Sequence, residues 1–249
     1  MTKVSVVSIV WNEVHSIRYF LDQFKWREFI QEIIIIDGGS DDGTLDVINE
    51  YKEILPIGLH VEPQNGARFS KEWNESSRRN MTLAWAQAPW VMMVDADEIV
   101  DESIWCSIPS WLDQDLVCVG FDRINYFVSP NYIFNFPDED RGVLARLWRN
   151  FRGINYTNSH LHCMINLHGF NLTDMIRQKQ AHTLSVPLPF HHLHRMLWPG
   201  KPAYIEYDSQ GKMVLQNPPE CEIMKLLESG KVRKFDGPWP SLFNKEGWV

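Results

Sequence analysis

The chain has 249 residues, and 44% of them are hydrophobic, which is enough apolar material to form a folded core. Its 24 Lys and Arg residues and 32 Asp and Glu residues give a net charge of −8, and the basic residues form no run. We therefore expect no nucleic-acid partner.

The cysteine pattern indicates an intracellular protein. The four cysteines are widely spaced and form no Cys-x-x-Cys pair: Cys106, Cys118, Cys163 and Cys221. We expect reduced thiols and a cytoplasmic location, with peripheral attachment to a membrane as the alternative. The apolar stretch at residues 4–10 is too short for a signal peptide or a membrane span, so no transmembrane segment is expected.

The first hundred residues alternate between strand-like and helix-like patterns. β-branched runs predict strands at 4–10 and 32–36, and apolar residues spaced by three or four positions predict a helix at 14–26 between them. Further elements follow in the same alternation: helices at 45–51 and 75–87, and strands at 59–62 and 90–94. This order predicts an α/β fold with a mostly parallel sheet flanked by helices.

The rest of the chain is less regular. Its patterns predict helices at 103–112 and 220–228, strands at 116–128, 143–149 and 156–165, and a loop at 129–141. Proline and aromatic residues dominate after residue 187, and no repeat or linker interrupts the chain. We expect a single domain over residues 1–249 with an irregular C-terminal extension.

Polar clusters follow three of the predicted strands. They are Asn12-Glu13, Asp37 and Asp95-Ala96-Asp97. The carboxyl ends of parallel strands meet at one edge of a sheet, so these clusters predict one site. An Asp-x-Asp pair occurs by chance in many proteins, but two buried carboxylates placed together favour a divalent cation such as Mg²⁺ or Mn²⁺.

Four motifs in this order resemble the family-2 glycosyltransferases with the GT-A fold. They are the segments 6–13 and 35–44, the pair Arg79-Asn80 and the segment 90–98. The resemblance covers about the first 100 residues. It implies a Rossmann-like GT-A sheet, with a nucleotide-sugar-binding half at 1–100 and an acceptor-side half with the C-terminal extension at 101–249.

The resemblance implies that several residues bind the nucleotide. Trp11, Asn12 and Glu13 line the base and ribose. Asp37 hydrogen-bonds the base, and Arg79 approaches the phosphate or the sugar. The alternative for Asp37 is a turn that only begins the next helix, and one residue can serve in both ways.

The same resemblance implies how the acidic segment 95–98 acts. Asp95, followed by Ala96, contacts the ribose or the sugar, and Asp97 ligates the Mn²⁺ or Mg²⁺ ion. Glu98 lies close to the donor sugar.

The segment 191–195 resembles the place where relatives bring a histidine to the metal and a basic residue to the diphosphate. It implies metal ligation by His192 and His194 and diphosphate binding by Arg195. The alternative is that these histidines are ordinary hydrogen-bonding groups in a packed corner.

The catalytic base is harder to assign. The stretch from Arg146 to His160 resembles the acceptor side of relatives, which usually ends in His-Glu, but this chain has His160-Leu161. We therefore place the base among Asp138, Glu139 and Asp140, for which a solvated acidic loop is the alternative.

The resemblance thus implies a metal-dependent transferase. It moves a sugar from a nucleoside diphosphate sugar, with a UDP-sugar favoured, to a hydroxyl of a glycan, lipid-linked or protein acceptor, with inversion. One alternative is a nucleotidyltransferase, although residues 10–13 contain neither the Gly nor the Arg of a typical phosphate loop. The other is a non-catalytic carbohydrate-binding protein, which would not need both Asp95 and Asp97.

Overall fold

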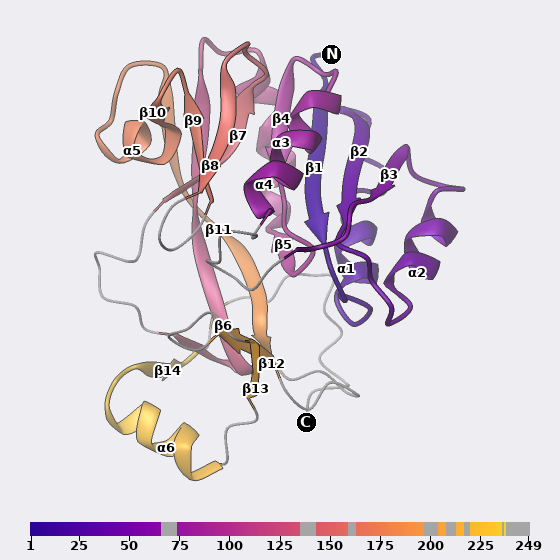
Figure 1. The fold of residues 1–249 in the computed structure, drawn as a ribbon. Helices are drawn as coiled ribbons and strands as arrows, with labels where there is room; N and C mark the ends of the chain where they lie inside the picture. Colours follow the sequence, from indigo (N-terminus) through magenta and orange to yellow (C-terminus); the bar gives the residue numbers. More distant parts are fainter. Residues whose placement is uncertain are drawn as a thin grey trace.

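The computed structural model describes residues 1–65, 74–134, 143–158, 163–196, 204–207, 213–216, 220–235 and 237. For residues 158, 195, 204–207, 213–216 and 220–223 it describes the backbone alone. Figure 1 shows a body built around a twisted sheet, from which two long strands carry a smaller group of elements.

The N-terminal half is a parallel sheet with connecting helices. Its strands lie side by side in the order β3-β2-β1-β4, all parallel. They are β1 (Val4–Val10), β2 (Ile30–Asp37), β3 (Ile57–Val61) and β4 (Trp90–Met93), linked by α1 (Ile17–Asp22), α2 (Thr44–Tyr51) and α3 (Glu75–Trp85). Val10 pairs with Asp37, so the first two strands end at the same level.

The sheet continues beyond β4 with mixed directions. The order is β4-β7-β6-β11-β5, and β7 runs antiparallel to β4 and β6. These strands are β5 (Glu98–Val100), β6 (Cys118–Phe134), β7 (Leu144–Arg149) and β11 (Thr183–Met196). β6 and β11 are parallel to each other and extend away from the body in Figure 1.

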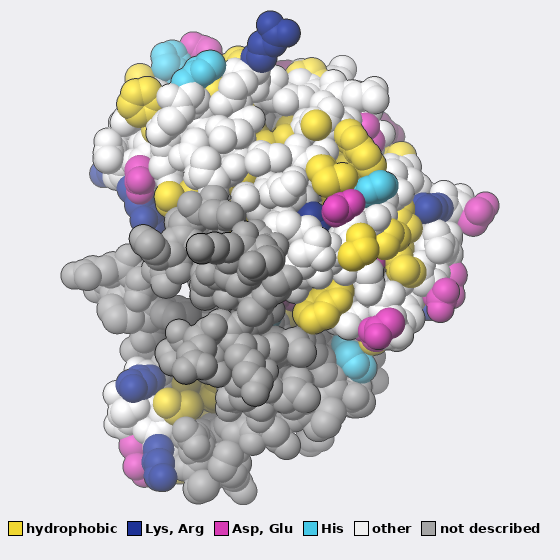
Figure 2. Space-filling model, in the orientation of Figure 1, with side chains coloured by type: hydrophobic (Ala, Val, Ile, Leu, Met, Phe, Trp, Pro, Cys, Tyr) yellow, Lys and Arg dark blue, Asp and Glu magenta, His cyan; other side chains and the backbone are white. Residues whose placement is uncertain are grey.

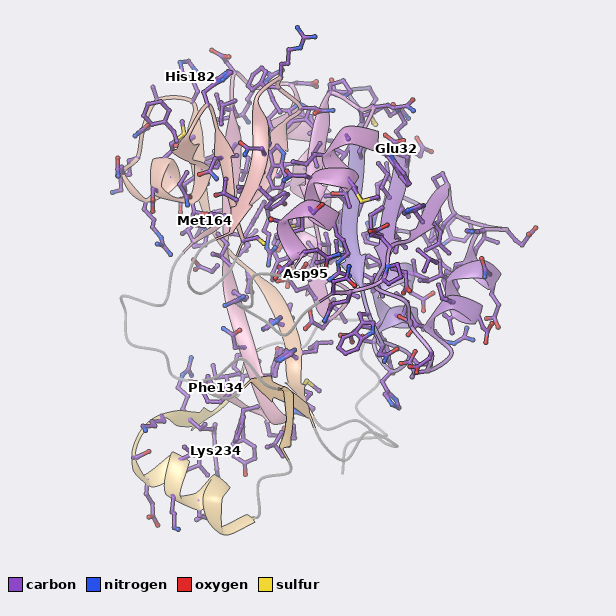
Figure 3. All side chains as sticks on the ribbon, viewed as in Figure 1. Glu32, Asp95, Phe134, Met164, His182 and Lys234 are labelled. Atoms are coloured by element: carbon purple, nitrogen blue, oxygen red, sulfur yellow. The ribbon has the colours of Figure 1, made fainter. Side chains whose placement is uncertain are left out.

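Smaller elements complete the described structure. β8 (Ile154–Asn158), β9 (Cys163–Leu167) and β10 (Phe170–Asn171) form a three-stranded antiparallel sheet, followed by α5 (Leu172–Arg177). At the far end of β6, β14 (Val232–Lys234) pairs with it, near Phe134 and Lys234 in Figure 3. The remaining elements are α4 (Glu102–Leu112), β12 (Tyr204–Tyr207), β13 (Met213–Gln216) and α6 (Glu220–Glu228).

The core explains why the central strands are apolar on both faces. Ile33 and Ile35 of β2 pack into one buried cluster with Trp90 and Trp105, whereas Ile34 belongs to a second cluster on the opposite face. Helices and loops cover both faces, so alternation between apolar and polar residues is absent from these strands. On the face drawn in Figure 2, the Lys and Arg side chains are scattered rather than gathered in one patch.

The α/β fold is confirmed, and the elements predicted for the first hundred residues are present. None of the described helices is long and apolar enough to cross a bilayer. Cys106, Cys118 and Cys163 are free thiols.

The helix predicted at 14–26 is wrong in length, because α1 contains only residues 17–22. Before it, the backbone N–H of Ser16 bonds to the carbonyl of Glu13 in a turn (3.0 Å). After it, Trp26 has a φ of +65°, which is incompatible with a continuing helix.

Three predictions in the second half are also wrong. The strand predicted at 156–165 is two antiparallel strands, β8 and β9. The loop predicted at 129–141 is wrong at its start, because β6 continues to Phe134, and residues 135–141 lie outside the described residues. The region after residue 187 is not irregular at first, since β11 runs to Met196 through two prolines, with a register shift between Val186 and Pro189 that accommodates them.

Gly120 of β6 allows a test of how closely this strand packs against α5 and Val143. A Cβ added there would lie 2.9 Å from Ile176 Cδ1 of α5 and would also collide with Val143. We expect Gly120→Ala to lower the free energy of unfolding by about 1–3 kcal/mol through overpacking. The matched control is Gly58→Ala in β3, where an added Cβ meets nothing within 4 Å. Urea unfolding should separate the two variants, and equal stabilities would contradict the packing described for β6.

Candidate active site

The predicted polar clusters meet at the carboxyl ends of β1, β2 and β4. The backbone turns after each strand and places its polar residues at one edge of the sheet. Figure 3 shows Asp95 at the centre of the molecule, where the N-terminal half meets β6 and β11. The site therefore combines the parallel strands with the second half of the sheet.

The loops after β1 and β2 are bonded to each other. Asn12, in a left-handed conformation with φ of +53°, donates its backbone N–H to Ser40 Oγ (2.8 Å). Its side-chain amide and Asp41 exchange two hydrogen bonds of 3.1 and 3.0 Å. The backbone N–H of Glu13 donates to Thr44 Oγ1 (2.8 Å). Trp11 lies half-buried beside this junction.

Asp37 forms a turn, as the alternative reading of its motif proposed. Its side chain is fully buried. One carboxylate oxygen accepts bonds from the backbone N–H groups of Gly39 (2.8 Å) and Ser40 (2.7 Å), and the other accepts from Ser40 Oγ (2.7 Å). Its predicted contact with a nucleotide base stays a prediction.

Asp95 lies between two arginines. Arg79 of α3 donates to one of its carboxylate oxygens (2.9 Å), and Arg146 of β7 approaches the other (3.4 Å). Arg79 also pairs with Glu75 (2.9 Å). Burial opposes ionisation of Asp95, but the two guanidinium groups outweigh it and keep the pKa of this carboxyl below its usual value.

Glu98 lies beneath Asp95, with no exposed surface. Its carboxylate accepts the backbone N–H of Asp95 (3.1 Å) and forms a short ion pair with Arg146. Burial raises the pKa of Glu98 to about 7, although Arg146 acts in the opposite direction. Ala96, between the two carboxylates in the chain, is also buried. Glu98 thus supports the turn, and its predicted place close to a sugar stays a prediction.

Asp97 faces the two histidines that the sequence singled out. Its Oδ2 lies 3.4 Å from His192 Nε2 and 3.4 Å from His194 Nδ1. Burial disfavours the charged form of Asp97, but the two imidazoles hold its pKa well below the usual range. Burial also lowers the pKa of His192 to about 4, so this imidazole is neutral at pH 7.

Asn125 of β6 orients His192. The Nδ1 atom of His192 lies 2.8 Å from Asn125 Oδ1, an oxygen that can only accept, so Nδ1 carries the proton. Nε2, the other ring nitrogen, faces the Asp97 carboxylate. Within the described ranges, no group of three or more His, Cys, Asp or Glu side chains is already arranged as a metal site.

Arg123 and Arg146 are residues to which the sequence reasoning gave no role. Arg123 is half-buried on β6, two positions before Asn125 and therefore on the same side of the strand. Burial lowers its pKa, and the carboxylates of Glu98, Asp95 and Asp97 oppose that effect. The sequence signal that could have identified Arg123 is the spacing of polar residues at alternate positions of an otherwise apolar strand.

Four predicted site residues are not placed in full. Asp138, Glu139 and Asp140, the predicted catalytic bases, lie outside the described residues. Arg195 lies in β11 opposite Phe127 of β6, but its side chain is outside the described part of the structure. The role predicted for each stays a prediction.

Known proteins are similar to this chain in sequence. The family model Glycosyl transferase family 2 matches residues 5–173. The lipopolysaccharide core biosynthesis glycosyltransferase LpsC of Rhizobium meliloti is 30% identical over 125 residues, which are 49% of this chain and 43% of LpsC. The poly(ribitol-phosphate) beta-N-acetylglucosaminyltransferase TarS of Staphylococcus aureus is 22% identical over 140 residues, which are 54% of this chain and 23% of TarS. This chain therefore spans less than half the length of these relatives.

Solved structures share the fold. The crystal structure of S. aureus TarS 1-349 in complex with UDP superposes with a TM-score of 0.54 at 13% identity, covering 80% of this chain and 62% of that one. A mycobacterial protein superposes with a TM-score of 0.50 at 13% identity, covering 88% and 84%. The GT-A fold implied by the sequence motifs is thereby confirmed. Because the family model covers well over half of the residues, the chain belongs to glycosyl transferase family 2.

Proposed function

We propose that this protein transfers a sugar from a nucleoside diphosphate sugar to an acceptor hydroxyl, with inversion and with a divalent cation. The observation that carries the proposal is the convergence of Asp97, His192 and His194 beside Asp95 at the carboxyl ends of the parallel strands. Family membership supports glycosyl transfer rather than nucleotidyl transfer. The acceptor is a glycan, a lipid-linked group or a protein.

The nucleoside is proposed to bind at the interlocked loops after β1 and β2. Trp11 offers an aromatic surface there, and Asn12 and Glu13 are held by the loop that follows Asp37. The TarS structure of the same fold was solved with UDP, which supports a UDP-sugar as the donor. Asp37 supports this site by holding its turn, and we keep its base contact as part of the proposal.

The chemistry of the donor groups fits a divalent cation. His192 Nε2 and the Asp97 carboxylate face each other across 3.4 Å, so one divalent cation could bind a nitrogen and an oxygen ligand there. His194 presents a second imidazole to the same carboxylate oxygen. We propose that Asp97, His192 and His194 hold the ion.

The kind of ligand bears on which cation is bound. Imidazole nitrogen suits Mn²⁺ better than Mg²⁺, which prefers oxygen ligands and retains water. Two imidazoles and one carboxylate therefore favour Mn²⁺. When bound, the ion would neutralise the charge that develops on the leaving diphosphate.

Arginine side chains also contribute to neutralising the diphosphate in this proposal. Arg123 lies near Asp97 and Glu98, and we propose that it binds the donor diphosphate together with Arg195. Arg79 and Arg146 hold Asp95 in place for its contact with the ribose or the sugar. Electrostatic groups fixed before the reaction stabilise its charged transition state without further rearrangement.

The transfer step requires a base on the acceptor side. The acceptor oxygen attacks the anomeric carbon from the face opposite the diphosphate, the bond from that carbon to the phosphate oxygen breaks, and a carboxylate takes the hydroxyl proton. We propose that this carboxylate belongs to Asp138, Glu139 or Asp140. A nucleoside diphosphate is the second product.

Asp97→Asn is the first test. It removes a negative ligand with little change of shape, so we expect Mn²⁺-dependent UDP binding, measured by titration calorimetry, to fall at least about 100-fold. The matched control is Asp115→Asn, because the Asp115 side chain is 91% exposed. Wild-type binding by the Asp97 variant in the presence of Mn²⁺ would refute its assignment as a ligand.

If His192 and His194 bind the metal, their removal should change how activity depends on metal concentration. We expect His192→Ala and His194→Ala to raise the Mn²⁺ concentration needed for half-maximal UDP-sugar hydrolysis by about 10–100-fold, with recovery at high Mn²⁺. Mg²⁺ should support less activity than Mn²⁺ in the wild type. His182→Ala, at a half-exposed site, serves as the control. A lower melting temperature with an unchanged Mn²⁺ profile would identify the histidines as packing residues only.

Arg123→Gln tests the diphosphate contact. Loss of hydrogen bonds to a charged group should weaken UDP binding by about 1.5–3 kcal/mol and leave the Mn²⁺ requirement unchanged. Arg177→Gln is the control, since Arg177 is 45% exposed on α5. Equal affinities of the two variants for UDP would remove Arg123 from the site.

A further inference from the structure

Asn125 of β6 is a buried polar residue that lies directly beside His192 of β11. The two residues are register partners in parallel strands, and Asn125 is 7% exposed. Its Oδ1 atom lies 2.8 Å from His192 Nδ1. Burial of a polar side chain is costly unless a hydrogen bond compensates for the loss of water. Here the compensating bond is made to one ring nitrogen of a histidine whose other ring nitrogen faces Asp97.

The backbone around His192 is fixed without help from Asn125. His192 pairs with Glu98 of β5 on the other side of β11. The next backbone N–H, that of Leu193, bonds to the carbonyl of Asp97 (2.8 Å). These contacts hold the main chain of β11 against the turn that carries Asp97. They do not determine how the imidazole ring is rotated or which of its nitrogens carries the proton, so a side chain has to determine both.

The Asp97 carboxylate by itself would favour the tautomer that cannot bind a metal ion. A neutral imidazole has one N–H, and a carboxylate only accepts hydrogen bonds. Asp97 Oδ2 lies 3.4 Å from His192 Nε2, so it would draw the proton to Nε2. A protonated Nε2 has no lone pair for a metal ion. The oxygen of Asn125 competes with this effect, because it attracts the proton to Nδ1 across the shorter distance of 2.8 Å.

We propose that Asn125 is a positioning residue for the metal ion: it keeps the proton of His192 on Nδ1 and leaves Nε2 able to bind the ion together with Asp97. A hydrogen bond to the second nitrogen of a ligating histidine fixes its tautomer and ring orientation, and its loss typically lowers metal affinity about 10–100-fold. The inference rests on the proposed function, since it requires His192 to be a metal ligand.

A second buried hydrogen bond joins the same two strands and provides a matched control. Tyr126 Oη lies 2.8 Å from His191 Nδ1, and both residues are only 1% exposed. Successive side chains of a strand point to opposite faces, so this pair lies on the face of the sheet away from Asn125 and His192. Tyr126→Phe therefore removes one buried hydrogen bond between β6 and β11 on the other face.

The tautomer of His192 can be measured in the metal-free protein. We expect ¹⁵N nuclear magnetic resonance at neutral pH to show the proton on Nδ1 in the wild type, and the signals missing from His192→Ala identify this residue. Asn125→Leu has a similar volume but no acceptor, so it should move the proton to Nε2. Asn125→Asp retains an acceptor oxygen and should keep the wild-type pattern, as should Tyr126→Phe.

Mn²⁺ affinity is the second measurement. Electron paramagnetic resonance quantifies free Mn²⁺ while the ion is titrated into the protein in the presence of UDP. Asn125→Leu should weaken Mn²⁺ binding about 10–100-fold, whereas Asn125→Asp and Tyr126→Phe should stay within about threefold of the wild type. This comparison separates the loss of positioning from the loss of a hydrogen bond between the strands.

Three results would overturn the inference. They are a wild-type spectrum with the proton on Nε2, equal losses of Mn²⁺ affinity in Asn125→Leu and Tyr126→Phe, and failure of Asn125→Asp to retain Mn²⁺ binding. The first result needs no variant, so it is decisive even if Asn125→Leu does not fold. If the wild type carries the proton on Nδ1 but binds no Mn²⁺ in the presence of UDP, the proposed function itself fails, which distinguishes the two failures.

Discussion

The shared carboxylate of Asp95 is the interaction on which the site depends. It joins Arg79 of α3 to Arg146 of β7, and Arg146 extends the contact to Glu98 at the start of β5. Buried ion pairs add little net stability, but removal of one partner leaves an uncompensated charge and costs several kcal/mol. These pairs therefore fix the turn between β4 and β5 in one geometry. The backbone N–H of Leu193 bonds to the Asp97 carbonyl (2.8 Å), so the same turn also positions β11.

Local sequence patterns determine the N-terminal half of the fold. The isoleucine run of β2 and the apolar run of β4 are buried on both faces, and the helices between them have a clear apolar spacing. The second half depends on pairing between distant segments. β11 contains prolines that argue against a strand, and it forms because β6 and β5 supply neighbours on both sides. Such neighbours cannot be recognised from the strand's own residues.

The same distinction applies to the site. The position of Asp95 and Asp97 at the sheet edge was predictable because they directly follow a recognisable strand, and the segment that contains His192 was singled out by its resemblance to relatives; their roles stay predictions. Arg123 and Asn125 were not predictable, since their relation to His192 depends on the register of β6 against β11, where Asn125 pairs with His192. If the pairing of β6 with β11 were shifted by one residue, both side chains would lie on the opposite face of the sheet. The partners of Arg146 likewise arise only when β7 pairs with β4.

The reciprocal bonds between Asn12 and Asp41 have a consequence for the entropy of nucleotide binding in the proposed function. The two loops they join are ordered by their own hydrogen bonds, with further support from the Asp37 turn. The conformational entropy of these residues is thus lost when the chain folds rather than when a nucleotide arrives. The nucleotide site proposed at these loops therefore has a backbone frame that is already ordered in the protein without a nucleotide.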